Sequence, residues 1–130
     1  MSTSPAAETV EGGCHCGAVR FRARISSHAA IRCNCSICTK KGFLHLLVPE
    51  EDFELLQGTD AIQTYTFGTH TAKHHFCKHC GIHSFYRPRS HPDRIDVNVY
   101  CLEGIDPSAF DVTLFDGKDW KGNIADLLKR

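Results

Sequence analysis

The sequence predicts a mainly β fold: a single small domain whose stacked sheets are held together by zinc. Three observations support this prediction. Hydrophobic and polar residues alternate in several short runs, turn-forming residues separate these runs, and seven of the eight cysteines fall into three compact motifs. Such alternation is typical of strands that bury one face, and closely paired cysteines are typical of metal sites.

Length and composition fit one globular domain. The chain has 130 residues, of which 42% are hydrophobic and 23% are charged. The 15 basic residues balance 15 acidic ones, so nucleic-acid binding through a basic surface is not expected. No apolar run approaches the roughly 18 residues that a membrane-spanning helix requires, so no membrane association is expected.

The clearest strand is expected over residues 19–25, where four apolar residues alternate with three arginines. A short helical turn is expected over residues 49–53, where a proline precedes three acidic residues. Further strands are expected over residues 43–48, 62–67, 72–76, 84–86, 95–99 and 112–115. Short strands with turns between them favour an all-β domain.

The two ends of the chain are expected to differ from this core. Residues 1–11 are predicted to form a flexible tail ahead of a zinc-binding domain at 12–130. The tail is small and polar and does not resemble a secretion signal, so we expect a cytoplasmic protein whose thiols stay reduced or bind metal. Residues 123–130 predict a terminal helix, with Asn123 as its cap and basic residues at its end.

Two of the cysteine motifs share one form, in which a pair of cysteines is followed by glycine and then by a strand. These pairs are Cys14 with Cys16 and Cys77 with Cys80. Two such turns complete one tetrahedral four-cysteine zinc site, in which glycine permits the tight bend. The pairs lie far apart in the sequence, so the metal would join two hairpins, and structural zinc can supply on the order of 10 kcal/mol of folding free energy.

The middle motif offers three more thiols, at Cys33, Cys35 and Cys38. Because the first zinc is already four-coordinate, this cluster implies a second metal ion or three free thiols. Three protein ligands with one open position are typical of catalytic zinc, whereas a structural site would need a distant fourth ligand. The candidates for that ligand are Cys101, His45, His74 and His75. A cysteine at the end of an alternating strand, such as Cys101, is more often a small buried apolar residue.

Three segments of the chain resemble the glutathione-dependent formaldehyde-activating enzyme family. These segments are residues 12–21, 33–42 and 76–85, and they occur in the order typical of that family. Residues 64–67 and 84–86 are particularly similar to the branch that includes centromere protein V. The resemblance extends from about Gly12 to Trp120, which is nearly the whole chain.

The resemblance implies a fold of small zinc-stapled β-sheets with two zinc ions per chain. It implies that the first and third cysteine pairs hold a structural zinc and that the middle cluster holds a second zinc associated with catalysis. The activity that names the family joins glutathione to formaldehyde. Centromere protein V, by contrast, is known for a role in chromatin.

The function we predict is that of a zinc-dependent carbon–sulfur lyase or adduct-forming enzyme. Its substrates would be glutathione or other thiol conjugates and an aldehyde, with glutathione as co-substrate. Metal binding deprotonates a thiol at neutral pH, and a zinc held by three thiolates favours sulfur over oxygen as its fourth partner. Cys33, Cys35 and Cys38 are therefore the predicted catalytic metal ligands.

The reaction also needs a proton carrier and a site for the glutathione carboxylates. Histidine is the usual proton carrier near neutral pH. The candidates are His45 and His83, together with His74, His75 and His79. Cationic side chains close to the motifs could bind the carboxylates, although a solvated charged face also explains each one. These cations are Lys40, Lys41, Arg87 and Arg89.

Two alternatives stay open at the level of sequence. A non-catalytic zinc module that binds a protein partner, as in centromere protein V, would close its second site with a fourth protein ligand. It would also expose an aromatic patch around Phe110, Phe115 and Trp120. Redox sensing by the middle cluster is the other alternative.

Exposed edge strands in a β-protein would also be compatible with a homodimer.

Overall fold

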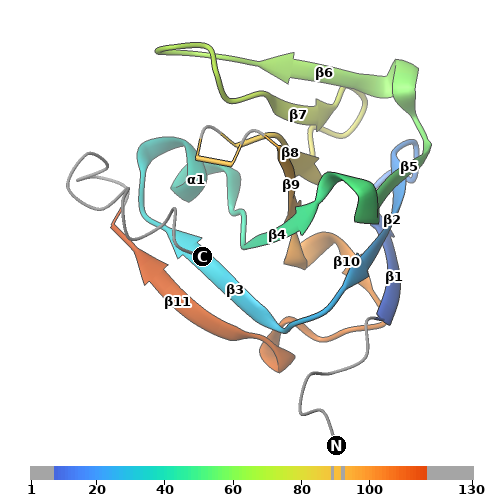
Figure 1. Cartoon of the computed structure of the whole chain (residues 1–130). Helices are drawn as coiled ribbons and strands as arrows, with labels where there is room; N and C mark the ends of the chain where they lie inside the picture. Colours follow the sequence, from blue (N-terminus) through green and yellow to red (C-terminus); the bar gives the residue numbers. More distant parts are fainter. Residues whose placement is uncertain (1–7, 89, 92, 117–130) are drawn as a thin grey trace, which may run out of the picture.

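The computed structural model describes residues 8–88, 90, 91 and 93–116, and in these residues it contains three β-sheets (Figure 1). The first sheet has the order β10 (Leu102–Glu103), β1 (Glu8–Gly13), β2 (Arg20–Ile25), β5 (Phe53–Gln57). The second has the order β11 (Asp111–Phe115), β3 (Ala29–Cys33), β4 (His45–Pro49), β9 (Arg94–Asn98), β8 (Phe85–Tyr86). The third is the hairpin of β6 (Ile62–Tyr65) and β7 (His74–Cys77). The mainly β class predicted from the sequence is confirmed.

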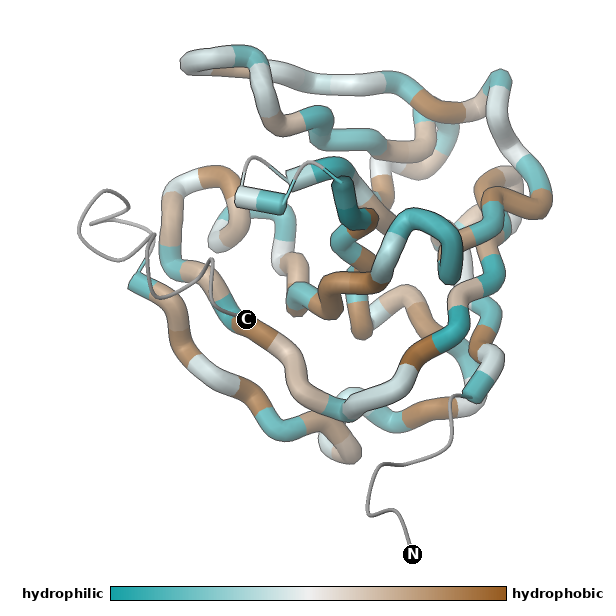
Figure 2. Tube along the Cα trace, viewed as in Figure 1, coloured by the Kyte–Doolittle hydropathy of each residue, from teal (hydrophilic) through white to brown (hydrophobic). Residues whose placement is uncertain are grey.

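Helical structure in the described residues is limited to short pieces. They are α1 (Ser36–Lys41) and the 3₁₀ turns η1 (Glu50–Asp52), η2 (Thr59–Ala61), η3 (Val99–Cys101) and η4 (Pro107–Ala109). The helical turn expected over residues 49–53 is η1, which Figure 2 shows as a hydrophilic arch between β4 and β5. No helix among these residues is both long enough and apolar enough to cross a membrane.

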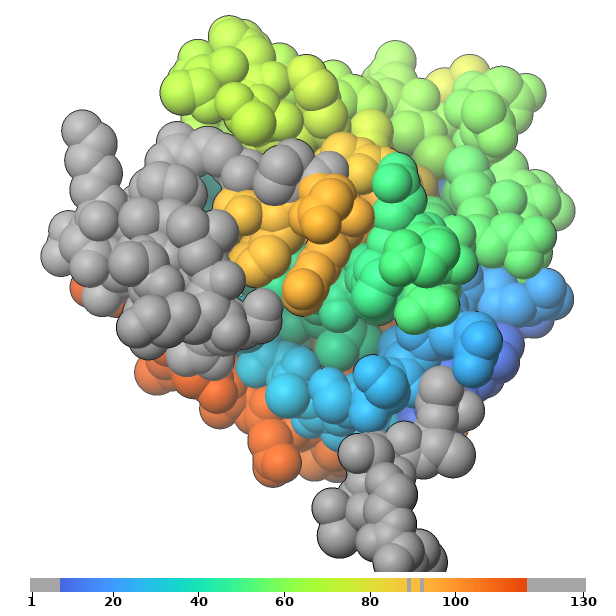
Figure 3. All heavy atoms as spheres, viewed as in Figure 1, coloured from blue at the N-terminus to red at the C-terminus, as the bar shows by residue number. Residues whose placement is uncertain are grey.

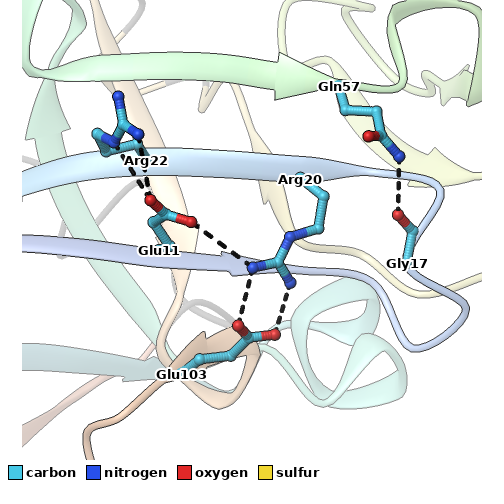
Figure 4. A network of polar contacts seen from close by, with 6 residues as sticks. All are labelled: Glu11, Gly17, Arg20, Arg22, Gln57 and Glu103. Atoms are coloured by element: carbon cyan, nitrogen blue, oxygen red, sulfur yellow. Dashed lines mark hydrogen bonds and ion pairs between the residues drawn. The ribbon is translucent and has the colours of Figure 1, made fainter.

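Strand β2 has one polar and one buried face, as its alternating sequence predicts. On the polar face, Arg20 donates two hydrogen bonds of 2.6 and 2.8 Å to the carboxylate of Glu103. Arg22 donates to Glu11 at 3.2 Å, and Glu11 also lies 3.8 Å from Arg20 (Figure 4). These ion pairs connect β10, β1 and β2, although their exposure to solvent limits their contribution to stability.

The buried face of β2 contributes to an aromatic centre between the sheets. The side chain of Phe21 is fully buried, stacks on Phe53 with ring centroids 5.5 Å apart, and meets Phe85 edge-on at 6.3 Å. Val97 and Val99, from the strand β9 and the turn that follows it, are fully buried in the same core. The core therefore joins the first sheet to the second.

Strand β9 is buried on both faces, which is unusual for an antiparallel strand with polar residues. Ile95 and Val97 point into the core, whereas Asp96 and Asn98 are buried on the opposite face at 3% and 4% exposure. This second buried face of the sheet positions the candidate site described below.

The structure corrects the predicted N-terminal boundary. Strand β1 begins at Glu8, inside the segment expected to be a tail, and pairs along its whole length with β2. The physical reason is that Val10 is 7% exposed and packs into the core, so this short segment gains both a complete hydrogen-bond ladder and apolar burial.

The predicted aromatic surface patch is also wrong for the residues that can be judged. Phe110 and Phe115 are only 6% and 8% exposed, so neither offers a docking surface. Trp120 and the helix predicted over 123–130 lie outside the described residues. Strand β11, which carries Phe115, pairs in parallel with β3, a strand that the sequence did not predict.

We expect Phe21→Ala to lower the free energy of unfolding by about 3–5 kcal/mol, because its ring fills the space between two other aromatic rings. Urea denaturation of the metal-loaded chain, followed by circular dichroism, measures this change. Arg24→Ala, on the exposed face of the same strand, is the control and should change stability by less than about 0.5 kcal/mol. Equal effects of the two substitutions would contradict the assignment of the core.

Candidate functional site

The first and third cysteine motifs fold into two similar turns. The backbone N–H of Cys14 donates to the carbonyl of Val19 at 3.1 Å, and that of Cys77 donates to Ile82 at 3.0 Å, so each turn closes over the same number of residues. Gly17 and Gly81 adopt positive φ angles of 84° and 77°, where a side chain would be strained. The similar sequences of the two motifs therefore reflect similar backbone turns.

These two turns bring four sulfur atoms together. The Sγ atoms of Cys14, Cys16, Cys77 and Cys80 lie within 4.8 Å of one another. Backbone N–H groups point at this cluster, since Val19 donates to Cys14 Sγ at 3.3 Å and His79 donates to Cys77 Sγ at 3.4 Å. Four converging sulfurs with N–H donors match the donor set of a closed structural metal site.

Backbone N–H groups lower the pKa of two of the four thiols in this cluster, Cys77 and Cys80. Partial burial raises the pKa of Cys80, but backbone N–H groups of Cys16 and Ile82 outweigh this effect and lower that pKa to about 6. The pKa of Cys77 is lowered in the same way, against the effect of burial, by the N–H groups of Cys80 and His79. The N–H of Ala18 acts to lower the pKa of Cys16, but burial and hydrogen bonds with the other three cysteines outweigh it and raise that pKa to about 11. Without a metal ion, Cys77 and Cys80 are therefore the members of this cluster that ionise most readily.

The middle motif places three sulfurs at the junction of β3 and α1. Cys33 ends β3, Cys35 caps the N-terminus of α1, and Cys38 lies buried in the helix. Their Sγ atoms also lie within 4.8 Å of one another, and Cys35 Sγ accepts the N–H of Cys38 at 3.4 Å. This local geometry follows from the spacing, because residues i and i+3 share one face of a helical turn.

Without a cation, the three thiols of this cluster cannot all ionise. Hydrogen bonds from Cys33 and Cys38 lower the pKa of Cys35 to about 2, whereas contacts with Cys33 and Cys35 raise the pKa of Cys38 strongly. Cys35 is thus the thiolate of this cluster, and the pKa values of Cys33 and Cys38 are raised. A bound divalent metal ion would allow all three thiols to ionise, and three soft sulfur donors fit zinc.

The three-cysteine cluster lies in the wall of a cavity of about 490 Å³. One wall is the second buried face of the five-stranded sheet, and the segment around the β6–β7 turn forms another. Figure 3 shows the β6–β7 hairpin, in green to yellow-green, covering one end of the molecule. The side chains that matter for the chemistry below are Cys33, Cys35, Cys38, His45, His74, Tyr86 and Asp96.

Within the described part of the chain, no ligand atom of a fourth cysteine, histidine or acidic residue lies within 4.8 Å of all three sulfurs. Cys101, predicted as a fourth ligand, does not reach them. Its thiol donates to the backbone carbonyl of His83 at 3.7 Å, and its side chain packs against the core. Burial raises the pKa of Cys101 to about 11, and its packing is that of a small, partly buried apolar residue.

His45 is the predicted proton carrier that the fold places in the cavity wall. Its Nδ1 lies 2.7 Å from Asp96 Oδ2, and the side chains of both residues are at most 5% exposed. The other ring nitrogen, Nε2, is buried without a hydrogen-bond partner among the described residues. The ring lines the cavity, and an imidazole nitrogen without a partner is free to accept a proton.

His74 is the second histidine in the cavity wall. Its Nδ1 lies 3.1 Å from Lys41 Nζ, and its ring stacks on Tyr86 with centroids 4.9 Å apart. Burial, reinforced by the charge of Lys41, lowers the pKa of His74 to about 4. Burial also lowers the pKa of Lys41 to about 8, and its ammonium lies 3.9 Å from the centroid of the Tyr86 ring.

The other three candidate histidines do not line this cavity. His75 contacts Thr64 at 2.8 Å on the β6–β7 hairpin, and His79 lies exposed in the cysteine turn. His83 precedes β8, where its carbonyl accepts a hydrogen bond from Asn98. The structure thus places His83 outside the lining of this cavity, and its catalytic role stays a prediction.

The predicted carboxylate-binding cations are also dispersed. Lys40 is exposed on α1, whereas Lys41 packs on aromatic rings outside the cavity wall. Arg87 donates to Glu50 at 2.6 Å, and Arg89 lies outside the described residues. The described cations thus do not converge on one point of the cavity.

The sequence analysis missed Asp96 and Tyr86. Asp96 alternates with Ile95 and Val97, so its position suggested a solvent-facing residue. The missing information was that both faces of β9 are covered. The sequence placed His45 and Asp96 in two expected strands, but only the structure shows that these strands pair.

We expect Cys35→Ser and Cys80→Ser each to remove one metal ion per chain, because each variant breaks a different cluster. Cys80→Ser should also lower Tm far more, since its cluster joins segments distant in sequence. Plasma mass spectrometry and thermal unfolding measure the two effects. Cys101→Ser is the control and should retain both ions; loss of an ion from it would contradict our ligand assignment.

Comparisons with known proteins show the family to which the chain belongs. A family model described as glutathione-dependent formaldehyde-activating enzyme matches residues 9–115. A Halomonas elongata protein named "Putative glutathione-dependent formaldehyde-activating enzyme" is 37% identical over an alignment of 81 residues, and the match covers 55% of this chain and about half, 51%, of that protein. The crystal structure of a Rhodobacter sphaeroides protein has a TM-score of 0.75 at 37% identity and covers 81% of this chain and 99% of its own. The chain belongs to the glutathione-dependent formaldehyde-activating enzyme family.

Proposed function

We propose that this chain is a zinc-dependent enzyme that forms and cleaves the carbon–sulfur bond between a thiol and an aldehyde. Glutathione and formaldehyde are the substrates that the family name suggests. The observation that carries the proposal is the position of the three-cysteine cluster, in a cavity wall and without a fourth protein ligand among the described residues. A purely structural zinc site would have four protein ligands, the number that the four-cysteine cluster offers.

Two zinc ions would have different roles in this protein. Cys14, Cys16, Cys77 and Cys80 would hold one ion that joins the two turns. Cys33, Cys35 and Cys38 would hold the other, which supplies a Lewis acid that favours the ionised form of a substrate thiol. The cavity volume of about 490 Å³ falls within the range of roughly 300–1,000 Å³ that is common for small-molecule sites.

The chemistry requires one proton to move from sulfur to oxygen. The thiol loses its S–H proton, sulfur bonds to the carbonyl carbon, the C=O π electrons move to oxygen, and oxygen gains the proton. His45 can accept this proton at Nε2 and return it, since its side chain lines the cavity and this nitrogen has no described partner. Cleavage of the adduct follows the same path in reverse, which is the lyase direction.

Exchange NMR with ¹³C-formaldehyde and glutathione tests the proposed function, since it measures how fast the two compounds equilibrate with their adduct. We expect the metal-loaded chain to accelerate this exchange and Cys35→Ser to abolish the acceleration. His45→Gln should reduce it by about 10²–10⁴-fold, the usual contribution of a general acid–base group.

His28→Gln provides the matched control for this experiment. His28 is exposed, contacts Glu8 at 2.6 Å, and does not line the cavity. Its substitution should leave the exchange rate unchanged. If the metal-loaded protein did not accelerate exchange of glutathione or of any other thiol tried with formaldehyde or larger aldehydes, the proposed function would be wrong.

A further inference from the structure

We infer that His45 and His74 face the same cavity as opposite tautomers. In this arrangement Nε2 of His45 is unprotonated and accepts a proton. Nε2 of His74 is protonated and donates a hydrogen bond to the substrate oxygen. Asp96 and Lys41 are the positioning residues that impose these tautomers. The role toward the oxygen rests on the proposed function, but the tautomers themselves do not.

The tautomer of His45 follows from its partner. An ionised carboxylate can only accept hydrogen bonds, so the 2.7 Å contact between His45 Nδ1 and Asp96 Oδ2 requires the proton on Nδ1. The Tyr86 hydroxyl lies 3.4 Å from the same nitrogen and is a weaker contact. Neutral His45 therefore has no proton on Nε2, the nitrogen that lacks a described partner.

The tautomer of His74 follows from the opposite kind of partner. A lysine ammonium can only donate, so the 3.1 Å contact with Lys41 Nζ requires His74 Nδ1 to accept. The rings of Phe43 and Tyr86 hold this ammonium, with centroids 4.4 and 3.9 Å from Nζ. Neutral His74 must therefore have its proton on Nε2.

Aromatic packing fixes both rings in the cavity wall. His74 stacks on Phe67 and on Tyr86, with interplanar angles of 21° and 12°. Tyr86 also meets His45 edge-on at 5.7 Å, and it is paired with Asp96 across β8 and β9. Tyr86 thus separates the two histidines and contacts both, so their orientations are fixed relative to each other.

Opposite tautomers would give the two histidines complementary roles. When a thiol adds to an aldehyde, negative charge develops on the carbonyl oxygen as the carbon–sulfur bond forms. The Nε2–H of His74 can stabilise this charge without giving up its proton, as a neutral donor does in an oxyanion hole. His45 takes the thiol proton at Nε2 and delivers it to the same oxygen, so the reaction is balanced.

Long-range ¹H–¹⁵N NMR of the full-length, metal-loaded chain, with ¹⁵N-histidine, tests the tautomers directly. We expect Nδ1–H for His45 and Nε2–H for His74 at pH 7. Asp96→Asn offers an amide donor and should shift His45 toward Nε2–H, while leaving His74 unchanged. Lys41→Met should make His74 populate both tautomers, while leaving His45 unchanged. The same tautomer on both rings of the unsubstituted chain would overturn the inference, even if no variant folded.

Kinetics tests the role of His74 toward oxygen. His74→Leu should lower kcat for thiol–aldehyde exchange by about 10²–10³-fold, the usual effect of losing an oxyanion donor, with little change in KM. His74→Gln keeps an N–H donor and should recover part of this loss. Full activity of His74→Leu would refute the role. Predicted tautomers in a chain without exchange activity would refute the proposed function and leave the tautomer assignment intact.

Discussion

Four cysteine sulfurs from two distant turns form the contact on which the arrangement of this molecule depends. Cys16 Sγ and Cys77 Sγ lie 3.6 Å apart although 61 residues separate them in the sequence. Cys77 ends β7, and His74 begins the same strand. A metal ion in this cluster would therefore fix the β6–β7 hairpin relative to the first sheet, and with it the position of His74 in the cavity wall. The structural site and the candidate active site are mechanically connected in this way.

The second constraint is the burial of polar residues on a sheet face that would normally be exposed. His45 and Asp96 satisfy each other with one short hydrogen bond, yet His45 Nε2 and Asp96 Oδ1 are buried without described partners. An unsatisfied buried polar atom costs about 1–3 kcal/mol. Two such atoms beside a cavity, next to a three-cysteine cluster, are more consistent with a functional site than with a structural core.

The sequence indicated both cysteine clusters because cysteine spacing is a local property. Both clusters form from the motifs in which they were predicted, and the alternation in β2 correctly predicted its buried and exposed faces. The positions of the other residues around the clusters depend on tertiary structure and could not be predicted from local spacing. Asp96 looked solvent-facing until both faces of β9 proved to be covered, and Cys101 lies in the turn η3 and packs against the core. Lys41 looked like a substrate-binding cation, but aromatic rings and His74 surround its ammonium.

The central claim is that the second metal site has a position open to a substrate sulfur. The most direct test loads the chain with cobalt and records the visible spectrum during a titration with glutathione, since cobalt–thiolate bands report coordination. We predict a saturable spectral change that Cys35→Ser removes and Cys101→Ser retains. A spectrum that shows two tetrahedral sites filled by protein ligands, and that does not change with any thiol, would contradict the account.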